Sequence, residues 1–257
     1  MIRDRCAVFG TFAPSEDVAR LIFFGLYALQ HRGQESSGIV VSDGQQLKRH
    51  AAGGLVSQVF DEESLAKLRG FAGIGHNRYS TTGSSTVANA QPLIVSGEAG
   101  TLALGHNGNI INALELREEL MERGFEFRTT TDSEVIANLI LASPGKDWCE
   151  RVASAMRRLI GAYSLTLLTT DMLMAVRDPL GVRPLCLGYV GSNPVVASET
   201  CALDHIGARF EKDLAPGEIV ALTAEGVRSL VVGGSTRRAA CVFEYIYLAR
   251  PDSILDG

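Results

Sequence analysis

The order of strand-like and helix-like segments is the feature that most constrains the fold of this chain. Short apolar or alternating runs, typical of strands, come first. A block of three helix-like segments follows at about 112–123, 132–142 and 147–160, and further strand-like runs come after it. Runs of strands separated by a block of helices predict two sheets with helices packed on their outer faces. We therefore expect an α+β layered domain rather than a doubly wound one.

Local signals define the individual segments. Asp43-Gly44 suits a tight hairpin turn between two strands. Ahead of this hairpin, a helix should begin at Ser15, which is followed by two acidic residues, and end near Gly33. The expected strands lie at about 6–10, 38–42, 45–50, 71–76, 92–95, 101–105, 162–169, 171–176, 184–188, 194–198, 218–222 and 227–232.

Composition limits the possible partners and compartment. The 257 residues are 46% hydrophobic and carry a net charge of -5, which provides no basic surface for nucleic acid. No apolar run approaches the roughly 18 residues that span a bilayer. The first five residues are too short and polar for a signal peptide, so we expect a cytoplasmic protein.

The five cysteines do not suggest a disulfide framework. They are odd in number and form no C-x-x-C pair. We interpret Cys149, Cys186 and Cys201 as inert small apolar residues. Cys6 and Cys241 need separate consideration.

Three polar motifs occur where apolar segments end. A solvated hairpin loop rarely concentrates His, Asn, Arg and Gly in this way three times. Each motif alone is weak evidence, but together with a cysteine near the N-terminus they indicate a catalytic site. The motifs are HRGQES at 31–36, GHNRYSTTG at 75–83 and GHNGN at 105–109.

With Cys6, these motifs resemble the class II glutamine amidotransferase domain, which has an N-terminal-nucleophile fold. Within that class, the chain looks most like the amidotransferase half of the amidophosphoribosyltransferases, glycosyltransferases of purine synthesis. The resemblance covers nearly the whole chain from Cys6. Its most specific phrases are LQHRGQES at 29–36, RYST at 78–81, FEYIY at 243–247 and ARPDS at 249–253. Ala7 and Asn77 depart from the pattern, which usually has Gly and Thr or Val there.

The resemblance implies a division of the chain. Residues 1–5 would be a cleaved propeptide, and 6–235 would form the glutaminase domain as a four-layer αββα sandwich. Residues 236–257 would begin the connection to a phosphoribosyltransferase domain. A start codon placed five residues early, without processing, is the alternative for the leader.

Cys6 is the expected nucleophile. A thiol with a pKa of about 8.5 is only a few per cent thiolate at neutral pH, so it needs a base. A free α-amino group, with a pKa of about 7.7–8.0, can accept that proton. This requires removal of residues 1–5, because the Cys6 nitrogen is otherwise an amide.

By resemblance, Asn107 and Gly108 form the oxyanion hole. One side-chain N–H and one backbone N–H would stabilise the tetrahedral intermediate, and losing such a donor typically costs about 3–4 kcal/mol. The alternative is a simple Asn-Gly turn before a helix.

The substrate contacts also follow from the resemblance. Arg78 and Thr81 would bind the glutamine carboxylate, and Asp132 its ammonium group. Arg32 and Gly33 would shape the pocket. The alternatives are a surface ion pair for Arg78 and a helix cap for Asp132.

The expected activity is hydrolysis of glutamine to glutamate and ammonia. In the full protein, ammonia would react with phosphoribosyl pyrophosphate to give 5-phosphoribosylamine. That protein would use Mg²⁺, would form a homo-oligomer, and could hold a 4Fe–4S cluster with Cys241 as one ligand. We expect no cofactor in this chain. The alternatives are another ammonia acceptor, a non-catalytic glutamine-binding domain, or a Cys-His peptidase using His31, His76 or His106.

Overall fold

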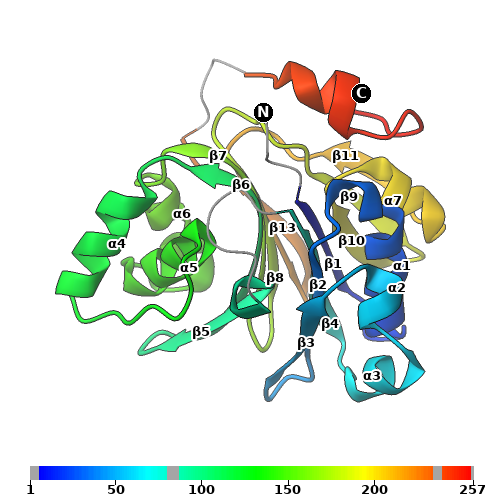
Figure 1. Ribbon diagram of the computed structural model, residues 1–257, viewed down its shortest axis with the longest axis horizontal. Helices are drawn as coiled ribbons and strands as arrows, with labels where there is room; N and C mark the ends of the chain where they lie inside the picture. Colours follow the sequence, from blue (N-terminus) through cyan, green and yellow to red (C-terminus); the bar gives the residue numbers. More distant parts are fainter. Residues whose placement is uncertain (1–5, 80–86, 234–238, 256–257) are drawn as a thin grey trace.

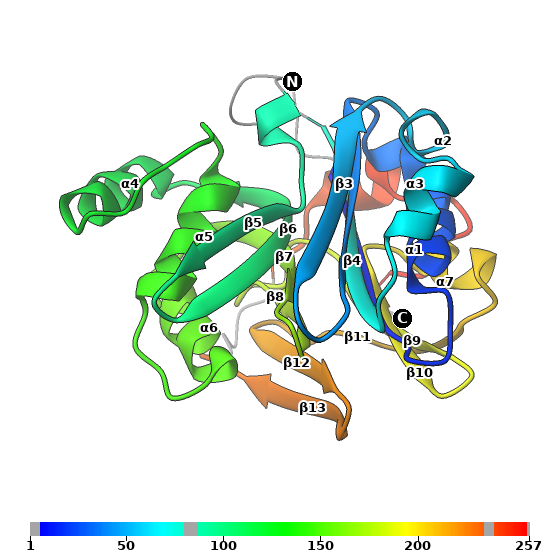
Figure 2. The ribbon, with the colours of Figure 1, turned by 90° about the horizontal axis from the view of Figure 1, so that it is seen from below.

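Two antiparallel sheets packed face to face form the centre of the molecule (Figures 1 and 2). The computed structural model describes residues 6–79, 87–233 and 239–255. The larger sheet has the order β11-β9-β10-β1-β4-β2-β3. Its strands are β1 (Ala7–Phe12), β2 (Ser36–Ser42), β3 (Leu47–Gly53), β4 (Ala72–Arg78), β9 (Cys186–Val190), β10 (Asn193–Ala197) and β11 (Arg209–Asp213).

The second sheet has six strands in the order β13-β12-β8-β7-β6-β5. They are β5 (Leu93–Gly97), β6 (Gly100–Ile110), β7 (Gly161–Leu168), β8 (Leu173–Arg177), β12 (Glu218–Thr223) and β13 (Gly226–Val231).

Helices cover the outer face of each sheet (Figure 1). The seven-stranded sheet carries α1 (Val18–Ala28), α2 (Val56–Val59), α3 (Glu62–Lys67) and α7 (Thr200–His205). The six-stranded sheet carries α4 (Ala113–Glu122), α5 (Asp132–Ala142) and α6 (Trp148–Met156). Short turns of helix lie at Gln30–Arg32 (η1), Val87–Asn89 (η2) and Glu244–Leu248 (η3). No helix of the described chain is long and apolar enough to cross a membrane.

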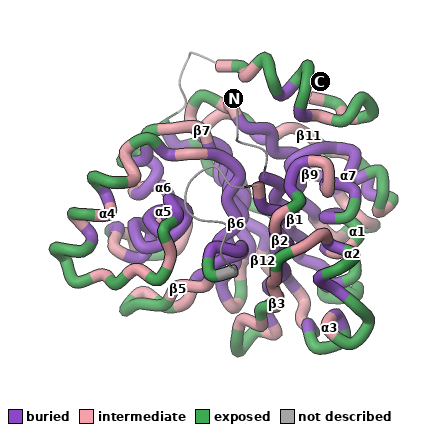
Figure 3. Tube along the Cα trace, in the orientation of Figure 1, coloured by how far each residue is buried: buried purple, intermediate pink, exposed green. Residues whose placement is uncertain are grey.

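Three apolar clusters lie between the four layers, and the central strands β1, β2, β4, β7 and β8 are buried along most of their length (Figure 3). Alternation along β1 shows how one strand serves two of these clusters. Phe9 packs with the helices of the larger sheet, whereas Val8 packs between the sheets. Successive side chains of a strand point to opposite faces, so a strand covered on both faces must be apolar at every position.

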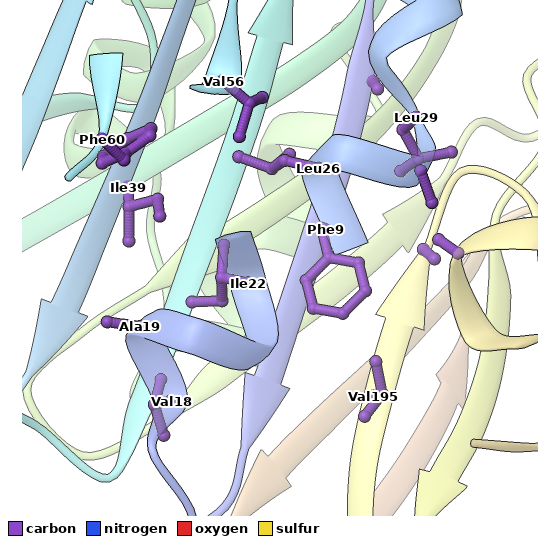
Figure 4. Close-up of a cluster of buried hydrophobic side chains, with 14 of the residues drawn as sticks. Phe9, Val18, Ala19, Ile22, Leu26, Leu29, Ile39, Val56, Phe60 and Val195 are labelled. Carbon is purple, nitrogen blue, oxygen red and sulfur yellow. The ribbon is translucent and has the colours of Figure 1, made fainter. Parts of the chain in front are cut away.

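The helix α1 lies close against the larger sheet (Figure 4). Ile22 and Leu26 from this helix are completely buried over β1 and β4. A Cβ atom on Gly75 of β4 would lie only 2.4 Å from Ile22 Cγ2, so glycine at this position permits the close approach.

The expected α+β fold and its four-layer αββα arrangement are confirmed. The helix expected at 132–142 has those bounds in the structure. The first helix begins later than expected, because Asp17 rather than Ser15 caps it by accepting a hydrogen bond from Arg20 N. The short elements α2, α3, α7 and β11 were not expected, since four to six residues carry too little periodicity.

The positions of two polar motifs also differ from expectation. His76 and Asn77 lie inside β4, and residues 106–109 lie inside β6, rather than after the strands end. A buried strand is ordinarily recognised by its apolar residues. The polar residues in β4 and β6 therefore made the predicted strands end too early.

Candidate active site

Cys6 directly precedes β1, near the middle of the larger sheet. Ala7 pairs with Asn77 of β4, and β10 pairs with the other edge of β1. The Cys6 side chain is buried, and its sulfur lies 3.4 Å from both the backbone N and the backbone O of Tyr79. The Tyr79 N–H donates to the sulfur, and the thiol can donate to the Tyr79 carbonyl.

Burial strongly affects the reactivity of Cys6. It raises the pKa of the Cys6 thiol to about 11, although the Tyr79 backbone and the Arg78 charge favour the thiolate. At neutral pH the group is therefore a thiol. A nucleophilic role requires a base that removes its proton during the reaction.

A cavity of about 250 Å³ opens beside Cys6. This volume includes space that is open to solvent. Its walls come from the start of β1, the end of β4, the strand β6 and the N-terminus of α5. The lining residues are Cys6, Arg78, Tyr79, Gln91, His106, Gly108, Thr131, Asp132 and Ser133.

Arg78 and Asp132 bring opposite charges to this cavity. Arg78 ends β4 and is 3% exposed, with its Nη1 atom 3.9 Å from Glu35 Oε2. Asp132 begins α5, and its Oδ2 atom accepts a hydrogen bond from Ile110 N at 3.2 Å. A buried cation and a buried carboxylate in one small cavity complement the carboxylate and ammonium of an amino acid.

The alternative roles of these two residues do not agree with the structure. Arg78 is itself buried, although its ion-pair partner Glu35 is partly exposed, so this contact differs from a pair of fully exposed side chains. The cap of α5 is Thr131, whose hydroxyl accepts from Glu134 N at 3.4 Å, rather than Asp132.

Asn107 and Gly108 lie within β6, so the alternative of a simple Asn-Gly turn is wrong. Gly108 lines the cavity and has φ of 149°, and a Cβ atom there would lie 2.1 Å from the carbonyl oxygen of Ala162. Only glycine fits this backbone. Asn107 is completely buried, and neither polar atom of its side chain has a hydrogen-bond partner within the described ranges.

A hydrogen-bonded group supports the cavity wall. Gln91 Nε2 donates to Ser133 Oγ at 2.9 Å, and Gln91 Oε1 accepts from His106 N at 2.8 Å. His106 Nδ1 lies 3.1 Å from the same Ser133 hydroxyl. Gln91, Ser133 and the Tyr79 backbone were not expected in the site. Ser133 lies in the polar cluster that begins α5, but Gln91 gives no sequence signal.

Among the described residues, no histidine side chain is hydrogen-bonded to the Cys6 sulfur. In the part of the chain that the structure describes, the atoms hydrogen-bonded to Cys6 Sγ belong to Tyr79. Burial lowers the pKa of His76 to about 3, so this imidazole is neutral, and its Nε2 atom bonds to His106 O. His31 Nε2 pairs instead with Glu199 at 2.9 Å.

Arg32 and Gly33 are not among the residues that line the cavity. The Arg32 Nε atom donates to the Cys6 carbonyl at 3.1 Å, and its terminal nitrogens bind Glu199 and Glu244. A Cβ atom on Gly33 would lie 2.7 Å from the carbonyl carbon of Asn77, so glycine lets the chain pass against β4. Thr81 and the predicted leader, residues 1–5, fall outside the described residues.

The two residues that depart from the usual amidotransferase pattern, Ala7 and Asn77, are both buried in the fold. Ala7 is completely buried in β1. The Asn77 side chain donates to Leu26 O at 2.7 Å and lies 3.1 Å from the Ser37 hydroxyl. Asn77 therefore joins α1, β2 and β4 rather than entering the cavity.

Cys241 is half-buried in the C-terminal segment, at a second cavity of about 310 Å³. Within the described ranges, no group of three or more His, Cys, Asp or Glu side chains could hold a metal ion. One thiolate does not complete a 4Fe–4S site, so any ligand role of Cys241 stays a prediction for a longer protein. Cys186 and Cys201 are buried, and burial raises the pKa of both thiols.

The four-layer sandwich, with the predicted nucleophile Cys6 just before a central strand, is the arrangement expected of an amidotransferase of the N-terminal-nucleophile class. A family model described as "Glutamine amidotransferase domain" matches residues 76–205, just over half of the chain. The chain therefore belongs to the glutamine amidotransferase family.

Particular relatives extend the match to almost the whole chain. Amidophosphoribosyltransferase of Synechococcus elongatus is 51% identical over 99% of this chain and 53% of its own length. The enzyme of the same name from Methanothermobacter thermautotrophicus is 45% identical over 100% of this chain and 55% of its own length. The chain thus spans about half the length of these curated relatives.

A solved structure also matches almost the whole chain. The glutamine phosphoribosylpyrophosphate amidotransferase from B. subtilis, complexed with ADP and GMP, is 40% identical with a TM-score of 0.92. The match covers 98% of this chain and 55% of that one.

Proposed function

We propose that this chain is the glutaminase half of an amidophosphoribosyltransferase. It hydrolyses glutamine to glutamate and ammonia, with Cys6 as nucleophile. The single observation that carries the proposal is the Cys6 sulfur in a small cavity with one buried cation, Arg78, and one buried carboxylate, Asp132. The names of the relatives support the choice of acceptor for the ammonia.

In this mechanism Arg78 binds the α-carboxylate of glutamine and Asp132 its ammonium group. These contacts, with Thr81 as a further carboxylate ligand, place the side-chain amide carbon beside Cys6 Sγ. The thiol proton passes to the α-amine of Cys6, which becomes free when residues 1–5 are removed. This base meets the need created by the high pKa of the buried thiol.

Attack on the amide carbon produces a tetrahedral oxyanion. The Gly108 N–H and the Asn107 amide donate hydrogen bonds to this oxygen. The buried Asn107 amide has no protein partner among the described residues, which leaves its N–H available. Ammonia leaves, and water then cleaves the γ-glutamyl thioester to release glutamate and regenerate the thiol.

In this proposal the second half-reaction takes place in a phosphoribosyltransferase domain, which would correspond to the part of the relatives' length that this chain does not span. There, ammonia displaces pyrophosphate from phosphoribosyl pyrophosphate and gives 5-phosphoribosylamine, in the first step of purine synthesis. Mg²⁺ serves that domain, and the full-length protein is a cytoplasmic homo-oligomer.

The test measures glutamate and ammonia release from glutamine, together with the intact mass of the active protein. We expect a mass that lacks residues 1–5, and no release by a Cys6→Ala variant. Active protein that retains its leader would contradict the proposed base. A full-length version that hydrolyses glutamine but releases no pyrophosphate would contradict the proposed acceptor.

A further inference from the structure

Four charged side chains form a buried cluster that reaches the backbone carbonyl of Cys6 and is not part of the cavity lining. The exposed fractions of the Arg32, Arg183, Glu199 and Glu244 side chains are 0%, 6%, 0% and 3%. Buried charges are costly unless each is paired. The cluster satisfies this condition with two cations and two carboxylates.

Glu244 occupies a special place in this cluster. Its two carboxylate oxygens lie 3.0 and 2.9 Å from Arg32 Nη2, and Oε1 also lies 2.8 Å from Arg183 Nη1. The same Arg32 guanidinium donates from Nε to the carbonyl of Cys6. One side chain therefore connects Glu244 to the backbone of the nucleophile.

Glu244 comes from the C-terminal segment 239–255, which crosses one end of the sandwich (Figure 1). The neighbours Tyr245, Ile246 and Tyr247 are exposed. Further along the segment, Arg250 N and Ser253 Oγ donate to Glu199 Oε2 at 3.0 and 2.7 Å. The segment thus supplies one of the two carboxylates that bind Arg32, Glu244, and is bound by the other, Glu199.

The charges of the cluster depend on one another. Burial opposes the charge of Arg32, but Glu244 and Glu199 outweigh it and hold the pKa of Arg32 above its usual value. Without Glu244, the Arg32 guanidinium would lose its two-oxygen partner and could move toward Glu199. Such a movement would release or displace the Cys6 carbonyl.

We propose that Glu244 is a positioning residue for glutamine hydrolysis, acting through Arg32 on the backbone of Cys6. This inference rests on the proposed glutaminase function. If Glu244 acts in this way, the position of the Cys6 backbone depends on whether the C-terminal segment is packed against the sandwich. Misplacement of a reacting group by about 1 Å can reduce a rate by about 100-fold, so small changes in this contact have measurable effects.

The test substitutes Glu244→Gln in the whole chain, which keeps the shape of the side chain and removes its charge. The matched control is Glu218→Gln, because Glu218 is also buried and ion-paired, with Lys212, but lies on β12 with partners of its own. An electrophilic glutamine analogue that alkylates the nucleophile, counted by intact mass, gives the number of competent sites.

We expect Glu244→Gln to lower kcat per labelled site about 10-fold or more. KM for glutamine should stay within about 2-fold, because Arg78 and Asp132 bind the substrate. Glu218→Gln should reduce thermal stability but leave kcat per labelled site unchanged. A merely structural role of Glu244 would lower the number of labelled sites and leave kcat per site unchanged, and this result would overturn the proposal.

Glu244→Asp keeps the negative charge and provides the decisive variant if Glu244→Gln does not fold. Its shorter side chain draws the carboxylate back from Arg32, so we expect a decrease in kcat per labelled site of about 3-fold or more, with KM unchanged. A value equal to that of the unsubstituted chain would overturn the proposal. The proposed glutaminase function would survive either negative result, because it depends on the Cys6→Ala variant.

Discussion

At the scale of single residues, the site combines groups whose positions tolerate little change. The constraint is steric at Gly108 and electrostatic at Arg78 and Asp132. Each kind of constraint predicts a different experimental result.

Gly108→Ala should impair both stability and activity. The new Cβ atom would meet Ala162 O in a backbone conformation that alanine rarely adopts. We expect a loss of about 1–3 kcal/mol in the free energy of unfolding, measured by denaturant titration. Glutamine hydrolysis should fall by about 100-fold, because the oxyanion donor is displaced. Gly191→Ala separates backbone strain from the loss of the donor, because Gly191 also has a positive φ but nothing lies within 4 Å of where its Cβ atom would be.

Asp132→Asn should weaken substrate binding. It removes the carboxylate that is expected to bind the glutamine ammonium but preserves the size of the side chain. A charge-assisted hydrogen bond of about 1.5–3 kcal/mol corresponds to an increase in KM of about 10-fold to 100-fold. The exposed Asp252→Asn variant is the control. An unchanged KM would remove Asp132 from the substrate site.

At the scale of elements, packing of α7 and the C-terminal segment depends on the carboxylate of Glu199. Glu199 directly precedes α7 and accepts hydrogen bonds from His31 and Arg32 on η1 and from residues 250 and 253. Burial opposes its charge, but His31 and Arg32 outweigh burial and lower the pKa of Glu199 to about 2.

This pKa predicts a loss of stability in acid. The ordinary value of 4.5 is lowered in the folded protein, so the ionised carboxylate stabilises the fold above about pH 4.5. The contribution should be lost progressively as the pH falls from about 4.5 to about 2. Unfolding free energies measured across this window should fall less steeply for Glu199→Gln. An identical slope for both proteins would contradict the assignment.

The contact between α1 and β4 gives another prediction at this scale. In Gly75→Ala, the Cβ atom would lie 2.4 Å from Ile22 Cγ2 and force the helix away from the sheet. Overpacking of this kind typically costs about 1–3 kcal/mol. The midpoint of thermal unfolding should therefore fall, and Gly75→Ala/Ile22→Ala should recover part of the loss. If the double variant is no more stable than Gly75→Ala, the strain does not arise from the contact with Ile22.

At the scale of the whole molecule, the layered architecture could be predicted from the sequence. The order of segments predicted two sheets with outer helices, and the resemblance predicted the αββα arrangement. Both are confirmed, because periodicity and segment order are local properties that survive in the fold. The bounds of α5 were predictable for the same reason, since polar capping residues precede a long apolar stretch.

The contacts of Arg32 were not predictable in this way. The residue was expected to shape the pocket, but its carboxylate partners are 167 and 212 residues away in sequence. Only the fold brings these groups together beside the Cys6 backbone. Its role in the reaction stays a prediction, whereas its burial and contacts are features of the structure.

The hydrogen-bond ladder of β1 also bears on how the proposed leader is removed. From Ala7 onward, the backbone of the strand is paired with β4 on one edge, and with β10 from Phe9 on the other. An exopeptidase needs free, extended backbone to enter its cleft. Digestion from the N-terminal side would therefore stall just before Ala7, which would leave Cys6 as the first residue of the proposed mature enzyme.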